Sequence, residues 1–188
     1  MRIVIATDIH GVTDAIRAQW LSLGDDLTLV SPWGGDGCPH PSEEAAVQAF
    51  HAQNGLQAYA DKIAQAAHQR PALLIGFSVG ATSMWLYAGR PRCHPQSRAR
   101  LYYGSRIRDH LAVKPRCAVS LVFAEHEPSF EPARLVAQLH QAEAQASIIP
   151  NTSHGFMNPH AQHYQADLAQ AQIEQLKRWI AHNPGAAE

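Results

Sequence analysis

Residues 72–82 read ALLIGFSVGAT, and this stretch decides the fold. Its first six residues form a short apolar run, which is typical of a strand covered on both faces in a parallel sheet. The G-x-S-x-G pattern overlaps the end of the run, and residues 82–88 continue with a helical pattern. The stretch therefore predicts a strand, a sharp turn at Ser78 and a helix, the context of a nucleophile elbow.

Steric crowding explains why the motif has glycine at two positions. At so sharp a turn, side chains at Gly76 and Gly80 would collide with the neighbouring backbone. The turn lifts the Ser78 hydroxyl above the sheet, and the N–H of Val79, at the start of the helix, points at an oxyanion that would develop there. The bare pentapeptide also occurs by chance, so a glycine-rich turn that only packs closely is the alternative.

Further apolar runs lie on both sides of this stretch, separated by amphipathic segments of helical period. The runs cover residues 2–6, 27–30, 101–103, 118–124 and 147–150, and the helical segments cover about 14–23, 55–68, 130–143 and 161–182. Thr13 or Asp14 is the expected cap of the first helix, and Asn54 that of the second. The alternation predicts an α/β fold with a doubly wound, mostly parallel sheet of about six strands in the order 2-1-3-4-5-6.

Length and charge narrow the class of protein. A chain of 188 residues is expected to form one domain, residues 1–188. Fifteen Lys and Arg against sixteen Asp and Glu leave no excess positive charge, which disfavours a nucleic-acid partner. No apolar run approaches the roughly 18 residues of a membrane span, and the N-terminal residues lack the features of a signal peptide. With three irregularly spaced cysteines, these observations predict a cytoplasmic monomer or homodimer that acts on a small molecule.

A serine nucleophile needs a base and a carboxylate that orients it, in the chain order Ser, acid, His on this fold. Glu127 follows the run 118–124 and His154 follows the run 147–150, so both fit in order and in placement. Glu125 is the main rival for the acid. A surface histidine is the plain alternative for His154, because the chain has twelve histidines.

The loop after the first strand should give the second oxyanion donor, and the N–H of Ile9 is the candidate. An ordinary strand-to-helix turn is the alternative reading of this segment. Candidate substrate contacts are Asp8 and His10 in that loop, Trp33 after the second strand, and Phe77 directly before Ser78. For Trp33, packing is nearly as good an explanation as a place in the pocket.

No cofactor or metal is expected. Segments 38–40 (CPH) and 93–94 (CH) hold soft ligands but have neither a C-x-x-C nor an H-x-x-x-H spacing. Arg106 and Arg108 follow the fourth strand and could meet an anionic acyl group, although a solvated surface pair is more usual.

Five blocks of the sequence together resemble the dienelactone hydrolases of the α/β-hydrolase superfamily. They are ATDIHGVTDAIRAQWLSLG (6–24), GFSVGA (76–81), YYG (102–104), VFAEHEP (122–128) and TSHGFMNP (152–159). The resemblance implies a hydrolase with nucleophile Ser78, acid Glu127, base His154 and oxyanion amides at Ile9 and Val79.

The chain departs from that family at several positions. Dienelactone hydrolases proper use cysteine where this chain has Ser78, and the acid is usually Asp where it has Glu127. Members that act on the dienelactone carboxylate place an arginine at the position of Asn158, and the acidic residue of the first loop corresponds to Asp8. The pair of strands that usually precedes the first strand is missing, so a minimal version of the fold is expected.

Acyl transfer to water is therefore the predicted reaction, on a small ester, lactone or thioester, while the dienelactone substrate is not carried over. A non-catalytic small-molecule-binding protein on a hydrolase scaffold is the competing hypothesis. The distance between the Ser78 hydroxyl and a His154 ring nitrogen discriminates between the two, since proton transfer needs about 3 Å.

Overall fold

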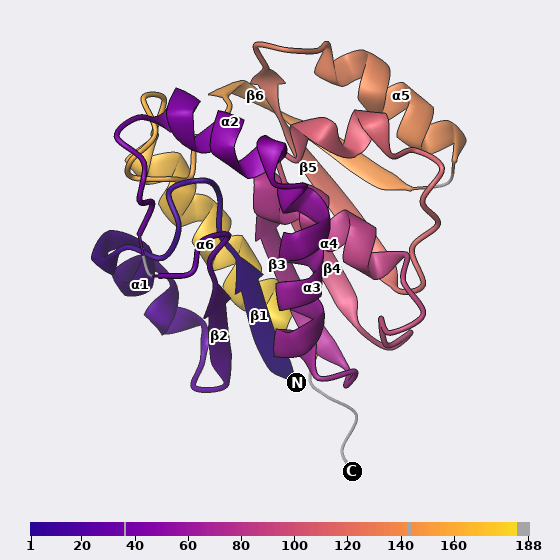
Figure 1. Cartoon of the computed structure of the whole chain (residues 1–188). Helices are drawn as coiled ribbons and strands as arrows, with labels where there is room; N and C mark the ends of the chain where they lie inside the picture. Colours follow the sequence, from indigo (N-terminus) through magenta and orange to yellow (C-terminus); the bar gives the residue numbers. More distant parts are fainter. Residues whose placement is uncertain (36, 143, 184–188) are drawn as a thin grey trace.

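The computed structural model describes residues 1–35, 37–142 and 144–183, and six parallel strands form its central sheet (Figure 1). The strand order is β2-β1-β3-β4-β5-β6, which confirms the predicted topology. Chain order reverses between β1 and β3, so the switch point lies beside the end of β3. The strands are β1 (Arg2–Ala6), β2 (Leu27–Val30), β3 (Ala72–Phe77), β4 (Arg98–Tyr102), β5 (Ala118–His126) and β6 (Gln145–Ser153).

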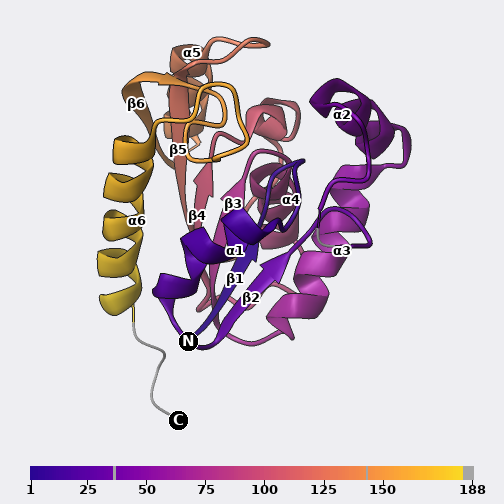
Figure 2. The same ribbon diagram turned by 90° about the vertical axis from the view of Figure 1, so that its left-hand side faces the viewer.

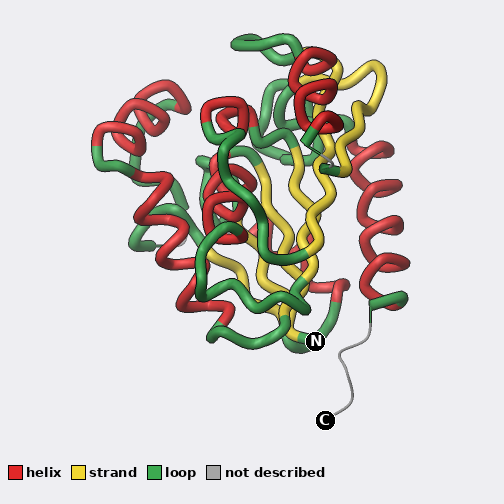
Figure 3. Tube along the Cα trace, turned by 90° about the vertical axis from the view of Figure 1, so that its right-hand side faces the viewer, coloured by secondary structure: helices red, strands yellow, loops and turns green. Residues whose placement is uncertain are grey.

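Helices cover both faces of the sheet, as Figures 2 and 3 show from opposite sides. One face carries α1 (Asp14–Trp20), the 3-10 turn η1 (Leu21–Leu23) and α6 (Ala166–Ala181). The other carries α2 (Glu43–Ala52), α3 (Gly55–Ala67), α4 (Val79–Ala88), the 3-10 turn η2 (Ser105–Asp109) and α5 (Pro132–Gln141).

Successive strand residues enter different cores because their side chains alternate across the sheet. Val4 and Leu74 belong to the core under α3 and α4, whereas Ile5 and Ile75 belong to the core under α1 and α6. All four are fully buried. Burial on both faces explains why these strands appear in the sequence as continuous apolar runs.

A buried tyrosine fixes the ends of the first two strands. The Tyr59 hydroxyl, on α3, donates to the carbonyl oxygens of Thr7 (3.0 Å) and Val30 (2.6 Å). One hydroxyl proton is thus shared between two carbonyl groups at the carboxyl ends of β1 and β2. The loops that leave these ends start from a fixed position.

Several helix boundaries differ from the predicted ones. Helix α2 was not predicted, and α6 begins at Ala166, which leaves Tyr164 outside it and 38% exposed. Thr13 caps α1 as expected, since its hydroxyl accepts the Ile16 N–H at 3.3 Å. Asn54 was predicted as a side-chain cap, but it lies in the left-handed region (φ 53°) and makes no capping hydrogen bond. Among the helices that the structure describes, none combines the length and apolar character of a bilayer crossing.

Candidate active site

Ser78 occupies a strained turn between β3 and α4, with φ 52° and ψ −116°. A Cβ added at Gly76 would lie 2.7 Å from the Cα of Ala81. One added at Gly80 would lie 2.4 Å from two carbonyl oxygens at the end of β1. Only glycine fits at either position, so the elbow is packed directly against β1 and Ser78 has little freedom to move.

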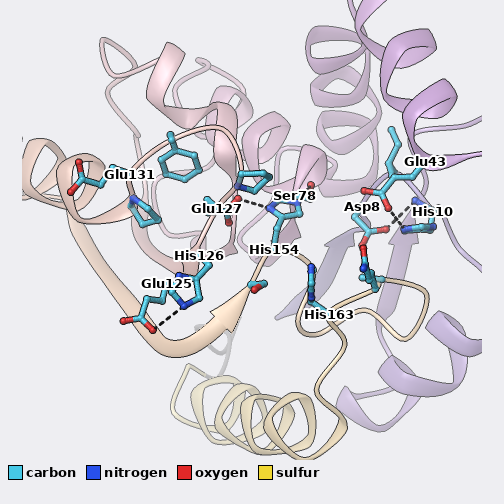
Figure 4. A pocket seen from close by; sticks show the side chains of 18 residues that line it. Asp8, His10, Glu43, Ser78, Glu125, His126, Glu127, Glu131, His154 and His163 are labelled. Atoms are coloured by element: carbon cyan, nitrogen blue, oxygen red, sulfur yellow. Dashed lines mark hydrogen bonds and ion pairs between the residues drawn. The ribbon is translucent and has the colours of Figure 1, made fainter.

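A continuous hydrogen-bond chain joins the three residues predicted as the triad (Figure 4). The Ser78 Oγ lies 2.8 Å from His154 Nε2, and His154 Nδ1 lies 2.7 Å from Glu127 Oε2. The three residues follow β3, β6 and β5, and the carboxyl ends of parallel strands share one edge of the sheet. The side chain of Glu127 is only 1% exposed, so water hardly competes for this contact.

The rival acid, Glu125, does not reach His154. Its Oε2 accepts the Asn151 N–H at 2.7 Å and lies 3.6 Å from His126 Nε2. Figure 4 shows the Glu125 and His126 pair set apart from Ser78. Of the two glutamates, Glu127 is therefore the one placed to orient the imidazole.

The surroundings of His154 favour its protonated form. Burial alone would lower the pKa of the imidazole, but the hydrogen bond and charge of Glu127, with the charges of Asp8 and Glu43, outweigh it and raise the pKa. A proton taken from Ser78 would thus be held on His154 at reduced cost.

The first loop is tied down on three sides. The Trp33 indole N–H donates to the Ile9 carbonyl at 2.8 Å. Asp8 accepts the His10 N–H at 3.0 Å through one carboxylate oxygen and the Asn158 amide through the other. Ile9 itself is 4% exposed and, like Ser78, lines the cavity described next. The loop that carries the first candidate oxyanion amide is therefore held in place.

Val79 is the first residue of α4, and the first N–H groups of a helix have no acceptor within it. Its position directly after Ser78 suits an amide that faces the reacting carbonyl.

A cavity of about 790 Å3 opens beside Ser78 and His154. Asp8 and His10, two of the predicted substrate contacts, line it, but Trp33 and Phe77 do not. Phe77 is buried in the core against α1, where it stacks on Trp20 at 4.9 Å between ring centroids. Trp33 packs edge-on against neighbouring rings and holds the first loop instead.

Several cavity residues were missed by the sequence analysis. Glu43 comes from the unpredicted helix α2, and its Oε2 lies 3.6 Å from His10 Nε2. The Glu43 carboxylate raises the pKa of His10 although burial opposes it. Ser42 before two glutamates is a typical helix start and was the available signal. The other missed lining residues that can carry charge are His126, Glu131 and His163.

The candidate cations and metal ligands lie elsewhere. Arg106 and Arg108 contact Asp109 at 3.4 and 3.7 Å and are not lining residues. Within the described ranges, no three His, Cys, Asp or Glu side chains gather in a group that could hold a metal ion.

Comparisons with known proteins agree with this architecture. The model of the dienelactone hydrolase family matches residues 39–183. An uncharacterized protein of Bacillus subtilis (strain 168), YczH, is 31% identical over 175 residues, 88% of this chain and 85% of YczH. A candidate dienelactone hydrolase from Klebsiella pneumoniae subsp. pneumoniae MGH 78578 superposes with TM-score 0.71 at 20% identity, over 95% of this chain and 85% of that one. Est1E from Butyrivibrio proteoclasticus gives TM-score 0.59 at 11% identity, over 96% and 87%.

Proposed function

Because the chain belongs to the dienelactone hydrolase family and is a hydrolase, we propose that it cleaves a small ester, lactone or thioester through an acyl-enzyme on Ser78. Family membership supports the reaction class, and the residues at the cavity support the division of roles. Serine in the elbow favours the acyl-enzyme route, in which one difficult step becomes two easier ones.

In the first step, the Ser78 Oγ attacks the substrate carbonyl carbon while His154 Nε2 takes the hydroxyl proton. The carbonyl electron pair moves to oxygen, and the Ile9 and Val79 N–H groups donate to this oxyanion. When the carbonyl re-forms, the bond to the leaving group breaks, and the leaving group receives the proton from His154. Glu127 holds the imidazole in the tautomer that leaves Nε2 free to accept.

Water releases the acyl group in the second step by the same sequence. It gives a proton to His154 as its oxygen attacks the acyl carbon, and the Ser78 Oγ leaves with that proton. One base and one pair of oxyanion donors therefore serve both steps.

One observation carries the proposal: the contacts of 2.8 Å and 2.7 Å that join Ser78, His154 and Glu127. The hypothesis of a non-catalytic binding protein predicts no such alignment. A distance far beyond 3 Å between the Ser78 hydroxyl and the His154 ring would have favoured that hypothesis. The 2.8 Å contact favours the hydrolase, because a general base must lie within hydrogen-bond reach of the proton it takes.

Replacing Ser78 tests the proposal. Ser78→Ala should abolish turnover of short p-nitrophenyl esters and labelling by a fluorophosphonate probe. Ser22→Ala is the matched control, since Ser22 is exposed in η1 and does not line the cavity. Labelling that persists in Ser78→Ala at the wild-type rate would refute the assignment of the nucleophile.

A further inference from the structure

The cavity beside Ser78 has a one-sided charge. Among its lining residues, all within the described ranges, neither lysine nor arginine occurs. The acidic lining residues are Asp8, Glu43, Glu125, Glu127 and Glu131. The only basic ones are the histidines His10, His126, His154 and His163.

This charge stays negative in every protonation state of the histidines. With all four protonated, the five carboxylates still leave one negative charge. Catalysis needs a neutral His154 to take the Ser78 proton, so the reactive form holds at most three imidazolium groups. At least two carboxylates then remain without a compensating charge in the lining.

Attack by Ser78 separates charge at this place, because the carbonyl oxygen becomes an oxyanion while His154 becomes an imidazolium, and the net charge of the site stays the same. Asp8 and Glu43 act on the charge of His154, whose pKa they help to raise, so their field reaches the reacting centre. A carboxylate on the substrate would be repelled by this field in the bound state and in the transition state. A cation on the substrate would be attracted in both.

The mouth of the cavity provides a place for such a cation. Glu131 is exposed between β5 and α5, and Pro128, Phe130 and Pro132 line the cavity around it. Arg108 stacks over the Phe130 ring at 5.3 Å from its centroid but does not line the cavity. A carboxylate among apolar side chains suits an alkylammonium group, whose methyl or methylene groups contact the apolar atoms while its charge faces the carboxylate.

We propose that this cavity selects esters or lactones that carry an ammonium group and rejects those that carry a carboxylate. The inference rests on the proposed function and adds the substrate class to it. Asn158 agrees with this selection, since it is buried, donates to Asp8 and brings no positive charge to meet a substrate carboxylate.

Coulomb's law gives the size of the effect. Unit charges about 10 Å apart, at an effective dielectric constant of about 20 and 0.1 M salt, change a rate roughly threefold. Each carboxylate thus raises the rate of a cationic ester and lowers that of an anionic ester, which changes their ratio roughly eightfold. Two uncompensated carboxylates give a ratio of kcat/KM between cationic and anionic esters of roughly 60.

The test uses three acetate esters of similar shape: 3-(trimethylammonio)phenyl, 3-tert-butylphenyl and 3-carboxyphenyl acetate. Each kcat/KM is divided by the rate of the same ester with imidazole, which corrects for the leaving group. We expect the order cationic, neutral, anionic. Added salt should lower the first value and raise the last.

Two variants test the source of the selection. Glu131→Gln should reduce the cationic-to-anionic ratio roughly eightfold, because one carboxylate of the lining is neutralised. Asp25→Asn is the matched control and should leave the ratio within twofold. It removes one negative charge from the exposed loop before β2, at the opposite edge of the sheet.

The outcomes separate the two proposals. Equal normalised rates for the three esters, with turnover that still depends on Ser78, overturn the charge selection and leave the proposed function standing. An equal effect of Asp25→Asn and Glu131→Gln also overturns it, because total charge would then be the cause. Absence of turnover for all three esters together with absence of fluorophosphonate labelling overturns the proposed function, and the selection with it.

Discussion

Replacing Glu127 by Gln tests the hydrogen-bond chain at its buried end. The change removes a carboxylate that contacts His154 Nδ1 at 2.7 Å and whose side chain is 1% exposed. A hydrogen bond to a charged group contributes about 1.5–3 kcal/mol, or roughly 10- to 150-fold in rate. The amide can also donate to Nδ1, which moves the imidazole proton to Nε2 and removes the base. With both effects we expect kcat to fall roughly 10^3- to 10^4-fold.

The pH profile gives a second readout. In the wild type, kcat/KM rises with pH as His154 loses its proton, and the pKa of His154 is raised because Glu127 and other carboxylates outweigh its burial. In Glu127→Gln, burial remains while the largest opposing contribution is lost. The acidic limb of the residual activity should therefore move to lower pH. Steady-state kinetics with one neutral ester across the acidic and neutral range measure both quantities.

Glu125→Gln is the matched control, because it makes the same chemical change two residues earlier. Its carboxylate binds the Asn151 N–H and pairs with His126, so we expect a loss of less than about tenfold with the neutral ester. Thermal unfolding of both variants establishes that each is folded. Activity of Glu127→Gln within tenfold of the wild type, or a larger loss in Glu125→Gln, would refute the reasoning.

Three further predictions concern the support of the site. Gly80→Ala should lower the free energy of unfolding by about 3 kcal/mol in urea titrations, because its Cβ would lie 2.4 Å from backbone oxygens; Gly34→Ala, with nothing within 4 Å of the added Cβ, should stay within about 0.5 kcal/mol. Trp33→Phe removes the indole N–H that holds the first loop, so kcat should fall about fivefold with little change in KM, and an unchanged kcat would contradict a positioning role. Glu43→Gln should lower the pKa of His10 measured by NMR titration, since the contact with the Glu43 carboxylate is the largest cause of its upward shift. Because that pKa is raised on folding, its contribution to stability is lost as pH rises through the folded value, and the variant should show less of this loss.

The sheet could be predicted because its strands are buried on both faces. Residues 72–77 are apolar throughout and residues 2–6 are apolar after Arg2, and the structure pairs the two strands inside the sheet. β4 was predicted from 101 but begins at Arg98, since the exposed Arg98 and the half-buried Arg100 alternate with buried residues and interrupt the apolar run. When one face of a strand carries charged residues, the apolar run is shorter than the strand, so the start of the strand is predicted too late.

The missed part of the cavity has a different cause. Helix α2 follows a loop rich in Gly and Pro, and it has two buried residues, Ala46 and Phe50. Ser42 before two glutamates indicates the start of this helix, but its weak apolar stripe does not show where the helix packs, so the position of Glu43 beside His10 could not be predicted. The two residues are also far apart in the sequence. Their contact depends on how α2 folds back over the end of the sheet, which the sequence pattern does not show.

The choice between Glu125 and Glu127 shows where sequence reasoning ends at this site. In a regular strand, residues two apart point to the same side, so both glutamates would be expected to face His154 equally. The pairing of β5 with β6 instead shifts register between Ala124 and His126, and such an irregularity re-aims the side chains that follow it. Glu125 then turns to the backbone of β6 and Glu127 to His154. The shift in register arises from how β5 and β6 pair, so it cannot be predicted from the sequence of either strand alone. The kinetic contrast between Glu127→Gln and Glu125→Gln therefore tests which of the two carboxylates orients the imidazole.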